Sequence, residues 1–134
     1  SLNLPLNDNT KNIIHDDAIA QMKDGVILIN AGRGGLVDTT AIIDNLKSEK
    51  IGGFGMDVYE HEDQFFYEDY SDKVFTDDVF ARLLTFKNVI ITAHQAFLTD
   101  KALEEIAKTT MKNINDFSTE TTIENLINLK KQES

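Results

Sequence analysis

Residues 25–38 read GVILINAGRGGLVD and contain three structural signals in succession. The run at 25–30 is apolar up to its last residue, which is the pattern of a strand covered on both faces. The glycine-rich residues 31–35 predict a tight turn after that strand. Asp38 then predicts the N-cap of a helix at 39–47. A strand, a tight turn and a helix together form the repeating unit of a parallel α/β sheet.

The rest of the chain continues the alternation of helix and strand. The expected elements are, in order, the end of a strand at residues 1–5, a short helix capped by Asp16 or Asp17 and ending at Met22, a strand at 53–58, a helix at 77–84, a strand at 88–92 and an amphipathic helix at 100–117. An acidic and aromatic loop at 60–76 and a further helical stretch around 123–129 complete the prediction. Helices between successive strands predict a parallel sheet, and such sheets bind ligands beyond the carboxyl ends of their strands.

The composition excludes several classes of protein and partner. A net charge of -10 argues against a nucleic acid or an anionic membrane as partner. The absence of cysteine excludes disulfides and thiolate metal sites, and it is consistent with a cytoplasmic protein. The sequence contains no signal peptide and no apolar run approaching the roughly 18 residues of a membrane span. The chain begins at Ser1 inside a strand-like run, which we interpret as a cut end.

Four polar residues, Arg33, Asp57, Glu62 and His94, lie at or just beyond the ends of three predicted strands. A guanidinium can bind a carboxylate through two parallel hydrogen bonds. An imidazole exchanges a proton near neutral pH, and a carboxylate bonded to it fixes its tautomer. Together these groups suit the reduction of a 2-keto acid, because hydride transfer to a carbonyl needs a proton for the forming alkoxide.

Each of these residues also has a purely structural interpretation. Arg33 is equally consistent with a solvent-exposed turn residue, and His94 with a residue that caps a loop. Asp57 is consistent with a turn-capping aspartate, but a buried carboxylate there needs a partner, such as a cofactor amide.

The acidic loop at 60–76 leaves the partner of the histidine open. On sequence alone Glu60, Glu62 and Asp63 are equivalent candidates for the carboxylate beside His94. No metal site is predicted, because these carboxylates lack the spacing and the glycine of a calcium loop. The chain also contains no G-x-G-x-x-G segment, so it lacks the phosphate-binding turn of a dinucleotide site.

Three segments resemble the signatures of the D-isomer-specific 2-hydroxyacid dehydrogenase family. Residues 29–38 (INAGRGGLVD) resemble its N-x-x-R-G-x-L-V-D signature, residues 50–60 (KIGGFGMDVYE) the second, and residues 88–94 (NVIITAH) the third, which carries the histidine. Their order and spacing agree over nearly the whole chain. Within the family, residues 56–62 (MDVYEHE) and 94–99 (HQAFLT) are most similar to the fermentative D-lactate dehydrogenase subgroup.

The resemblance implies a fold, residue roles and a cofactor. Residues 1–97 would be the C-terminal half of a Rossmann-like doubly wound parallel sheet, and residues 98–134 the C-terminal helical segment of the substrate domain. Arg33 would hold the substrate carboxylate, His94 would be the acid–base residue, and Glu62 would pair with it. The cofactor would be NAD, with its nicotinamide and ribose side lined by Leu4, Pro5, Thr10, Ala31, Gly32, Arg33 and Asp57.

The resemblance further implies a cytoplasmic, homo-oligomeric enzyme that interconverts pyruvate and D-lactate. Another small D-2-hydroxy acid as substrate, or a non-catalytic binding or assembly module, is the alternative. The chain departs from the family at Ala93, where many members have proline, and at Asn3, where many have histidine. Because the glycine loop is missing, we expect the isolated chain to be inactive. Because a half sheet exposes an unpaired edge and apolar faces, we also expect it to self-associate.

Overall fold

The computed structural model describes residues 1–66, 69, 72, 76–119 and 125. The chain divides into two compact units, Ser1–Ala96 and Phe97–Ser134. The helical stretch expected around 123–129 lies outside the described residues, except for residue 125, and so does part of the loop expected at 60–76.

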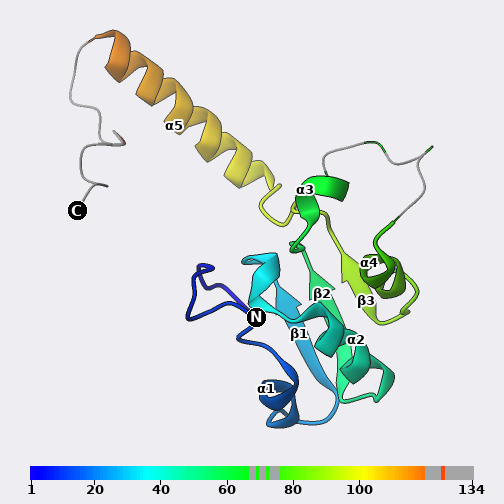
Figure 1. Cartoon of the computed structure of the whole chain (residues 1–134). Coiled ribbons are helices and arrows are strands. Elements are labelled where there is room, and N and C mark those ends of the chain that lie inside the picture. The colour runs from blue at the N-terminus through cyan, green and yellow to red at the C-terminus, as the bar shows by residue number, and fades with distance from the viewer. Residues whose placement is uncertain (67–68, 70–71, 73–75, 120–124, 126–134) are drawn as a thin grey trace. The chain divides into compact units, whose positions relative to one another are not determined.

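The first unit is built on a three-stranded parallel sheet in the order β1-β2-β3 (Figure 1). The strands are β1 (Val26–Asn30), β2 (Ile51–Met56) and β3 (Val89–Ile91). In register, Leu28 lies beside Phe54, and both strand pairs are parallel, which confirms the predicted sheet. Of the strand expected at 1–5, Leu2 alone pairs with the sheet, through an isolated parallel bridge to Asn30.

One helix precedes β1, and helices fill the connections between the strands. They are α1 (Asp16–Ala20), the 3₁₀ turn Gly34–Leu36, α2 (Thr39–Lys47), α3 (Glu62–Phe65) and α4 (Asp78–Leu83). The bounds of α2 are those predicted, and the Asp38 side chain caps it by accepting the N–H groups of Thr40 and Ala41. Asp77 caps α4 in the same way, through the N–H of Phe80. A capping carboxylate satisfies N–H groups that have no partner within the helix.

The predicted bounds of α1 and β2 are wrong, and α1 ends at Ala20 rather than at Met22. The N-cap of α1 is His15, whereas Asp16 and Asp17 lie in the first turn, where carboxylates interact favourably with the helix dipole. Strand β2 begins and ends two residues before the predicted 53–58. The strand includes Gly52, whose backbone lies close to that of Gly25. A Cβ on Gly52 would lie 2.6 Å from the Gly25 carbonyl oxygen, so only glycine permits this close approach of the two backbones.

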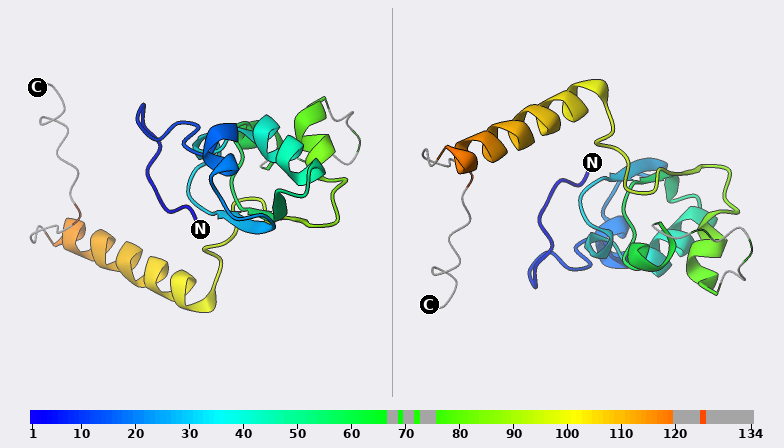
Figure 2. Two further views of the ribbon diagram at one scale, coloured as in Figure 1. Left: turned by 90° about the horizontal axis from the view of Figure 1, so that it is seen from below. Right: turned by 90° about the horizontal axis from the view of Figure 1, so that it is seen from above.

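The core of the first unit lies between the sheet and one layer of helices. Figure 2 shows α1, α2 and α4 on one side of the strands. Leu28 and Phe54 face this layer and are buried, together with Ile42 of α2. On the opposite face, Ile27 and Ile90 are 71% and 69% exposed. Among the described residues, the sheet is therefore covered on one face only, although β1 has the apolar pattern of a strand covered on both.

The second unit contains the helix α5 (Asp100–Ser118), capped by the Thr99 side chain through the N–H of Ala102. The helix begins at the predicted residue and has an apolar stripe, but none of its residues is buried. The exposed large side chains of this stripe are Leu103, Ile106, Ile114 and Phe117. None of the described helices combines the length and the apolar character needed to cross a bilayer.

Candidate functional site

The turn after β1 contains Arg33, and hydrogen bonds from the Asn30 side chain stabilise this turn. The Asn30 side chain is completely buried; its amide donates to the Arg33 carbonyl at 2.9 Å, and its oxygen accepts the Gly32 N–H at 3.2 Å. The guanidinium itself is exposed, and its Nη1 donates to the Gly32 carbonyl at 2.7 Å. Asn30 therefore shapes the turn and leaves the charged end of Arg33 on the surface.

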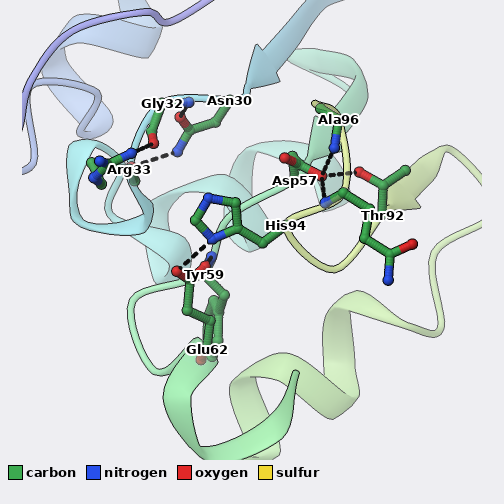
Figure 3. Close-up of polar contacts among 10 residues, drawn as sticks. Asn30, Gly32, Arg33, Asp57, Tyr59, Glu62, Thr92, His94 and Ala96 are labelled. Atoms are coloured by element: carbon green, nitrogen blue, oxygen red, sulfur yellow. Dashed lines mark hydrogen bonds and ion pairs between the residues drawn. The ribbon is translucent and has the colours of Figure 1, made fainter. Parts of the chain in front are cut away.

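Asp57 follows β2 directly and binds the loop after β3. Its Oδ1 accepts hydrogen bonds from the Thr92 hydroxyl, from the N–H of Gln95 at 2.7 Å and from the N–H of Ala96 at 2.9 Å (Figure 3). Burial raises the pKa of this carboxyl, but the three hydrogen bonds and the nearby His94 outweigh burial and leave the pKa below its usual value. Asp57 is thus a loop-capping aspartate, as its structural interpretation proposed.

His94 lies in the loop that Asp57 holds. Its main-chain N–H donates to the Asp57 carbonyl, and both Ala93 and His94 have positive φ angles, of 51° and 58°. The left-handed region is unfavourable for residues with a Cβ, so the hydrogen bonds to Asp57 stabilise a backbone that would not form alone. This backbone places the imidazole between the ends of β2 and α3 (Figure 3).

Glu62 supplies the carboxylate beside the imidazole. Its Oε1 lies 2.9 Å from Nδ1 of His94, and its Oε2 accepts the main-chain N–H of Tyr59 at 3.1 Å. The side chains of Glu62 and His94 are 18% and 32% exposed. Residue chemistry alone left Glu60 and Asp63 as equal candidates, and the family resemblance implied Glu62. In the described contacts the structure pairs Glu62 with His94 and leaves Glu60 and Asp63 exposed.

An apolar cavity of about 240 Å³ opens beside the strand ends. Two residues expected to contact the cofactor, Ala31 and Asp57, line it, together with Ile29, Thr92 and Ala96. A flat aromatic group of nicotinamide size suits such a cavity, because ligand sites are mostly apolar with a few placed polar groups.

The other residues expected at the cofactor lie along the neighbouring backbone. A Cβ on Gly32 would lie 3.3 Å from the carbonyl oxygen of Leu4, which is a tight contact, so these segments approach closely. The Thr10 hydroxyl donates to the Pro5 carbonyl at 2.7 Å. Leu4 and Pro5 are exposed.

The structure thus brings Glu62 and His94 into direct contact, and Asp57 binds the loop that contains His94. Arg33 makes its described hydrogen bond to Gly32 and not to either of them. Within the described ranges, no three His, Asp or Glu side chains converge in a way that could hold a metal ion.

Sequence reasoning missed two residues that build the site, Asn30 and Thr92. Each is a polar residue that closes an otherwise apolar strand run. Buried polar groups need hydrogen-bond partners, so a polar residue in that position is a usable signal of a structured turn.

Comparison with known families matches residues 1–96 to the family described as "D-isomer specific 2-hydroxyacid dehydrogenase, NAD binding domain". The chain is 47% identical over 125 residues to 2-hydroxyacid dehydrogenase A of Aspergillus oryzae, which covers 93% of this chain and 36% of that protein. It is thus similar to about a third of the length of its curated relatives.

Solved structures show the same likeness. A D-lactate dehydrogenase from Treponema pallidum superposes with a TM-score of 0.88 at 34% identity, over 96% of this chain and 39% of that one. A D-lactate dehydrogenase from Aquifex aeolicus, complexed with NAD and lactic acid, superposes with a TM-score of 0.75 at 38% identity, over 88% and 36%.

Proposed function

Because the chain belongs to the D-isomer specific 2-hydroxyacid dehydrogenase family, we propose that it carries the acid–base site of an NAD-dependent enzyme that interconverts pyruvate and D-lactate. The observation that carries this proposal is the contact of 2.9 Å between Glu62 and Nδ1 of His94. A carboxylate–imidazole pair at the carboxyl ends of parallel strands can move a proton where such sheets bind their ligands.

His94 is the acid in the direction of reduction. With Nδ1 bonded to the Glu62 carboxylate, Nε2 is the ring nitrogen that faces the substrate, and it donates its proton to the keto oxygen as the C–O bond becomes single. The imidazolium becomes a neutral imidazole in this step, and it takes the proton back when D-lactate is oxidised. Glu62 stabilises the imidazolium and keeps the ring in one orientation.

Arg33 binds the substrate carboxylate and polarises the keto group. Its guanidinium is exposed at the same end of the sheet as the pair, and a planar fork matches a carboxylate through two parallel bonds. The hydrogen bond from Nη1 to the Gly32 carbonyl orients the fork before substrate arrives.

The cavity beside the strand ends is the proposed place of the nicotinamide ring. Ala31 and Asp57 line it, and we propose that Leu4, Pro5, Thr10 and Gly32 contact the ribose side. When bound, NADH supplies the hydride that forms the new C–H bond of the product. The residues of this chain orient the substrate carbonyl, exchange its proton and exclude water from the apolar cavity.

Pyruvate is the proposed substrate because two solved relatives are D-lactate dehydrogenases, one of them complexed with lactic acid. The resemblance also favours a cytoplasmic homo-oligomer, with residues 98–134 belonging to the substrate domain. We expect these 134 residues alone to be inactive, because their sequence lacks the G-x-G-x-x-G turn.

The test uses the natural polypeptide that contains residues 1–134, purified from its source. NADH consumption is measured with pyruvate and with a branched-chain 2-keto acid, and the chirality of the product is determined. Faster turnover of pyruvate, with D-lactate as product, supports the proposal. Faster turnover of the branched-chain acid would replace pyruvate as substrate, and no turnover of either acid would contradict the proposed activity.

A further inference from the structure

The backbone of Tyr59 contacts both halves of the proposed site, through the two peptide groups that flank its Cα. On one side, the Tyr59 N–H donates to Oε2 of Glu62, whose other oxygen is bonded to His94. On the other side, the backbone of Gly34 packs closely against the peptide group that joins Tyr59 to Glu60. A Cβ on Gly34 would lie 2.1 Å from the Tyr59 carbonyl carbon and 2.2 Å from the Glu60 nitrogen.

The position of the Tyr59 backbone therefore sets two distances at once. Its N–H fixes how far the Glu62 carboxylate reaches toward His94, and its carbonyl side packs against the turn after Arg33. A shift of this backbone would move the acid–base pair and the substrate-binding turn relative to each other. Misplacement of such groups lowers a rate even when no catalytic group is lost.

The side chain of Tyr59 anchors this backbone to α4. The residue is only 3% exposed, and its hydroxyl donates to Oδ2 of Asp77 at 2.7 Å. The ring packs on Phe80, with 4.9 Å between ring centroids. Asp77 is itself held in place, because its Oδ1 accepts the Phe80 N–H at the start of α4.

The hydroxyl of Tyr59 stays a hydrogen-bond donor over the whole pH range of enzyme activity. Burial, with the hydrogen bond and negative charge of Asp77 and the charge of Glu60, raises the pKa of this tyrosine far above its usual value of 10. The Tyr59 hydroxyl therefore keeps its proton near neutral pH, so a change in a pH profile caused by its removal there acts through other groups.

We propose that Tyr59, anchored by its bond to Asp77, is a positioning residue that holds Glu62 against His94 and supports the Arg33 turn. The inference rests on the proposed function and names a further residue pair on which that function depends. Neither Tyr59 nor Asp77 touches the reacting atoms, so both act through Glu62.

The test compares two variants that break one bond from opposite ends. Tyr59→Phe removes the hydroxyl and keeps the ring. Asp77→Ser removes the acceptor of that hydroxyl and keeps a side chain able to cap α4. The matched control is Asp38→Ser, which makes the same change at the N-cap of α2, where the aspartate binds only backbone N–H groups in the described contacts.

The expected result is a fall in kcat of about tenfold for both variants, smaller than the roughly hundredfold or more that an acid–base group contributes. The pH–rate profile should shift in both, whereas Asp38→Ser should leave both quantities as in the parent. The double variant should be no slower than either single one, because both remove the same interaction.

The imidazole is also observed directly, by ¹⁵N NMR of His94 as a function of pH. Among the described residues, the charged and titratable groups of the surrounding elements include Arg33, Asp57, Tyr59, Glu60, His61, Glu62, Asp63 and Asp77. A change in the ring ¹⁵N shifts of His94 in both variants is expected. This readout needs no turnover, so it tests the positioning role even when no 2-keto acid is reduced.

Unchanged kcat, pH–rate profile and His94 shifts in the folded variants would overturn the inference and make Tyr59 a core residue only. If one variant fails to fold, the other still decides, since each breaks the bond independently. Failure of the wild-type protein to consume NADH would instead contradict the proposed function and leave the NMR comparison standing.

Discussion

His94 donates its main-chain N–H to the main-chain carbonyl of Asp57, so the loop that carries the imidazole is tied to the end of β2. The Asp57 carboxylate completes the tie by binding the next two N–H groups, on Gln95 and Ala96. The left-handed φ angles of Ala93 and His94 cost roughly 1–2 kcal/mol each, and these contacts offset that cost. The geometry of the site therefore depends on a carboxylate 37 positions before the histidine in sequence.

Replacing Asp57 should change how stability depends on pH. Its folded-state pKa is lowered, so its contribution is present above the unfolded value of about 3.9 and is lost as pH falls through the lower folded value. Asp57→Asn should therefore lower the free energy of unfolding at pH 7 more than at pH 3, as measured by urea unfolding. Asp44→Asn, on the exposed surface of α2, is the control. Equal losses at both pH values would contradict the assignment.

Removing the charge of Glu62 should slow the reaction. In Glu62→Gln a neutral amide replaces the carboxylate that stabilises the imidazolium, so kcat should fall by about a hundredfold. Steady-state kinetics of the natural polypeptide measure this. Glu60→Gln makes the same change two residues away on an exposed side chain and should leave kcat nearly unchanged. A larger effect at Glu60 than at Glu62 would reverse the assignment of the pair.

Arg33→Lys should weaken binding of the 2-keto acid. A lysine keeps the positive charge but cannot form the two parallel bonds of a guanidinium, so KM for pyruvate should rise by about tenfold or more. The matched control is Arg82→Lys on α4, where the guanidinium lies over the Phe86 ring at 5.0 Å. KM values that change equally in the two variants would argue against a substrate-binding role for Arg33.

Adding one methyl group at Gly34 should be disruptive. A Cβ there would lie 2.1 Å from the Tyr59 backbone, and backbone atoms cannot move aside as a flexible side chain can. Gly34→Ala should lower the free energy of unfolding by about 1–3 kcal/mol, as expected for overpacking. Gly53→Ala is the control, because its nearest atom would be at an ordinary 3.5 Å. Similar thermal unfolding of the two variants would show that the contact at Gly34 is looser than described.

The isolated 134-residue chain should self-associate through the open face of its sheet. Ile27 and Ile90 are 71% and 69% exposed on that face, and exposed apolar patches of this kind drive association. Light scattering should show species larger than a monomer, and Ile27→Lys with Ile90→Lys should reduce them. The control, Met111→Lys, changes an exposed side chain of α5. A clean monomer without these substitutions would contradict the expectation.

Local signals in the sequence were sufficient for much of the fold. The N-cap Asp38 and the apolar spacing of the following residues predicted α2 correctly at both ends. The apolar run before Asn30 predicted β1, and Asp77 predicted the start of α4. These features depend on residues a few positions apart, so a linear reading can recover them. The same reading misplaced the cap of α1, because two adjacent aspartates and a histidine compete there.

The sequence by itself determined a parallel α/β sheet and placed Arg33, Asp57, Glu62 and His94 at its carboxyl edge. The family resemblance implied that Glu62 pairs with His94, whereas local sequence did not distinguish it from Glu60 or Asp63. The tertiary structure shows which contacts form. Glu62 reaches His94 across 32 positions of sequence, and Asp57 satisfies its buried carboxylate with N–H groups up to 39 positions away. Spacing cannot resolve such pairings, because three carboxylates of one loop are equivalent until packing orients them. Packing between turns that are far apart in sequence orients them, and the local sequence of one turn does not predict its contact with the other.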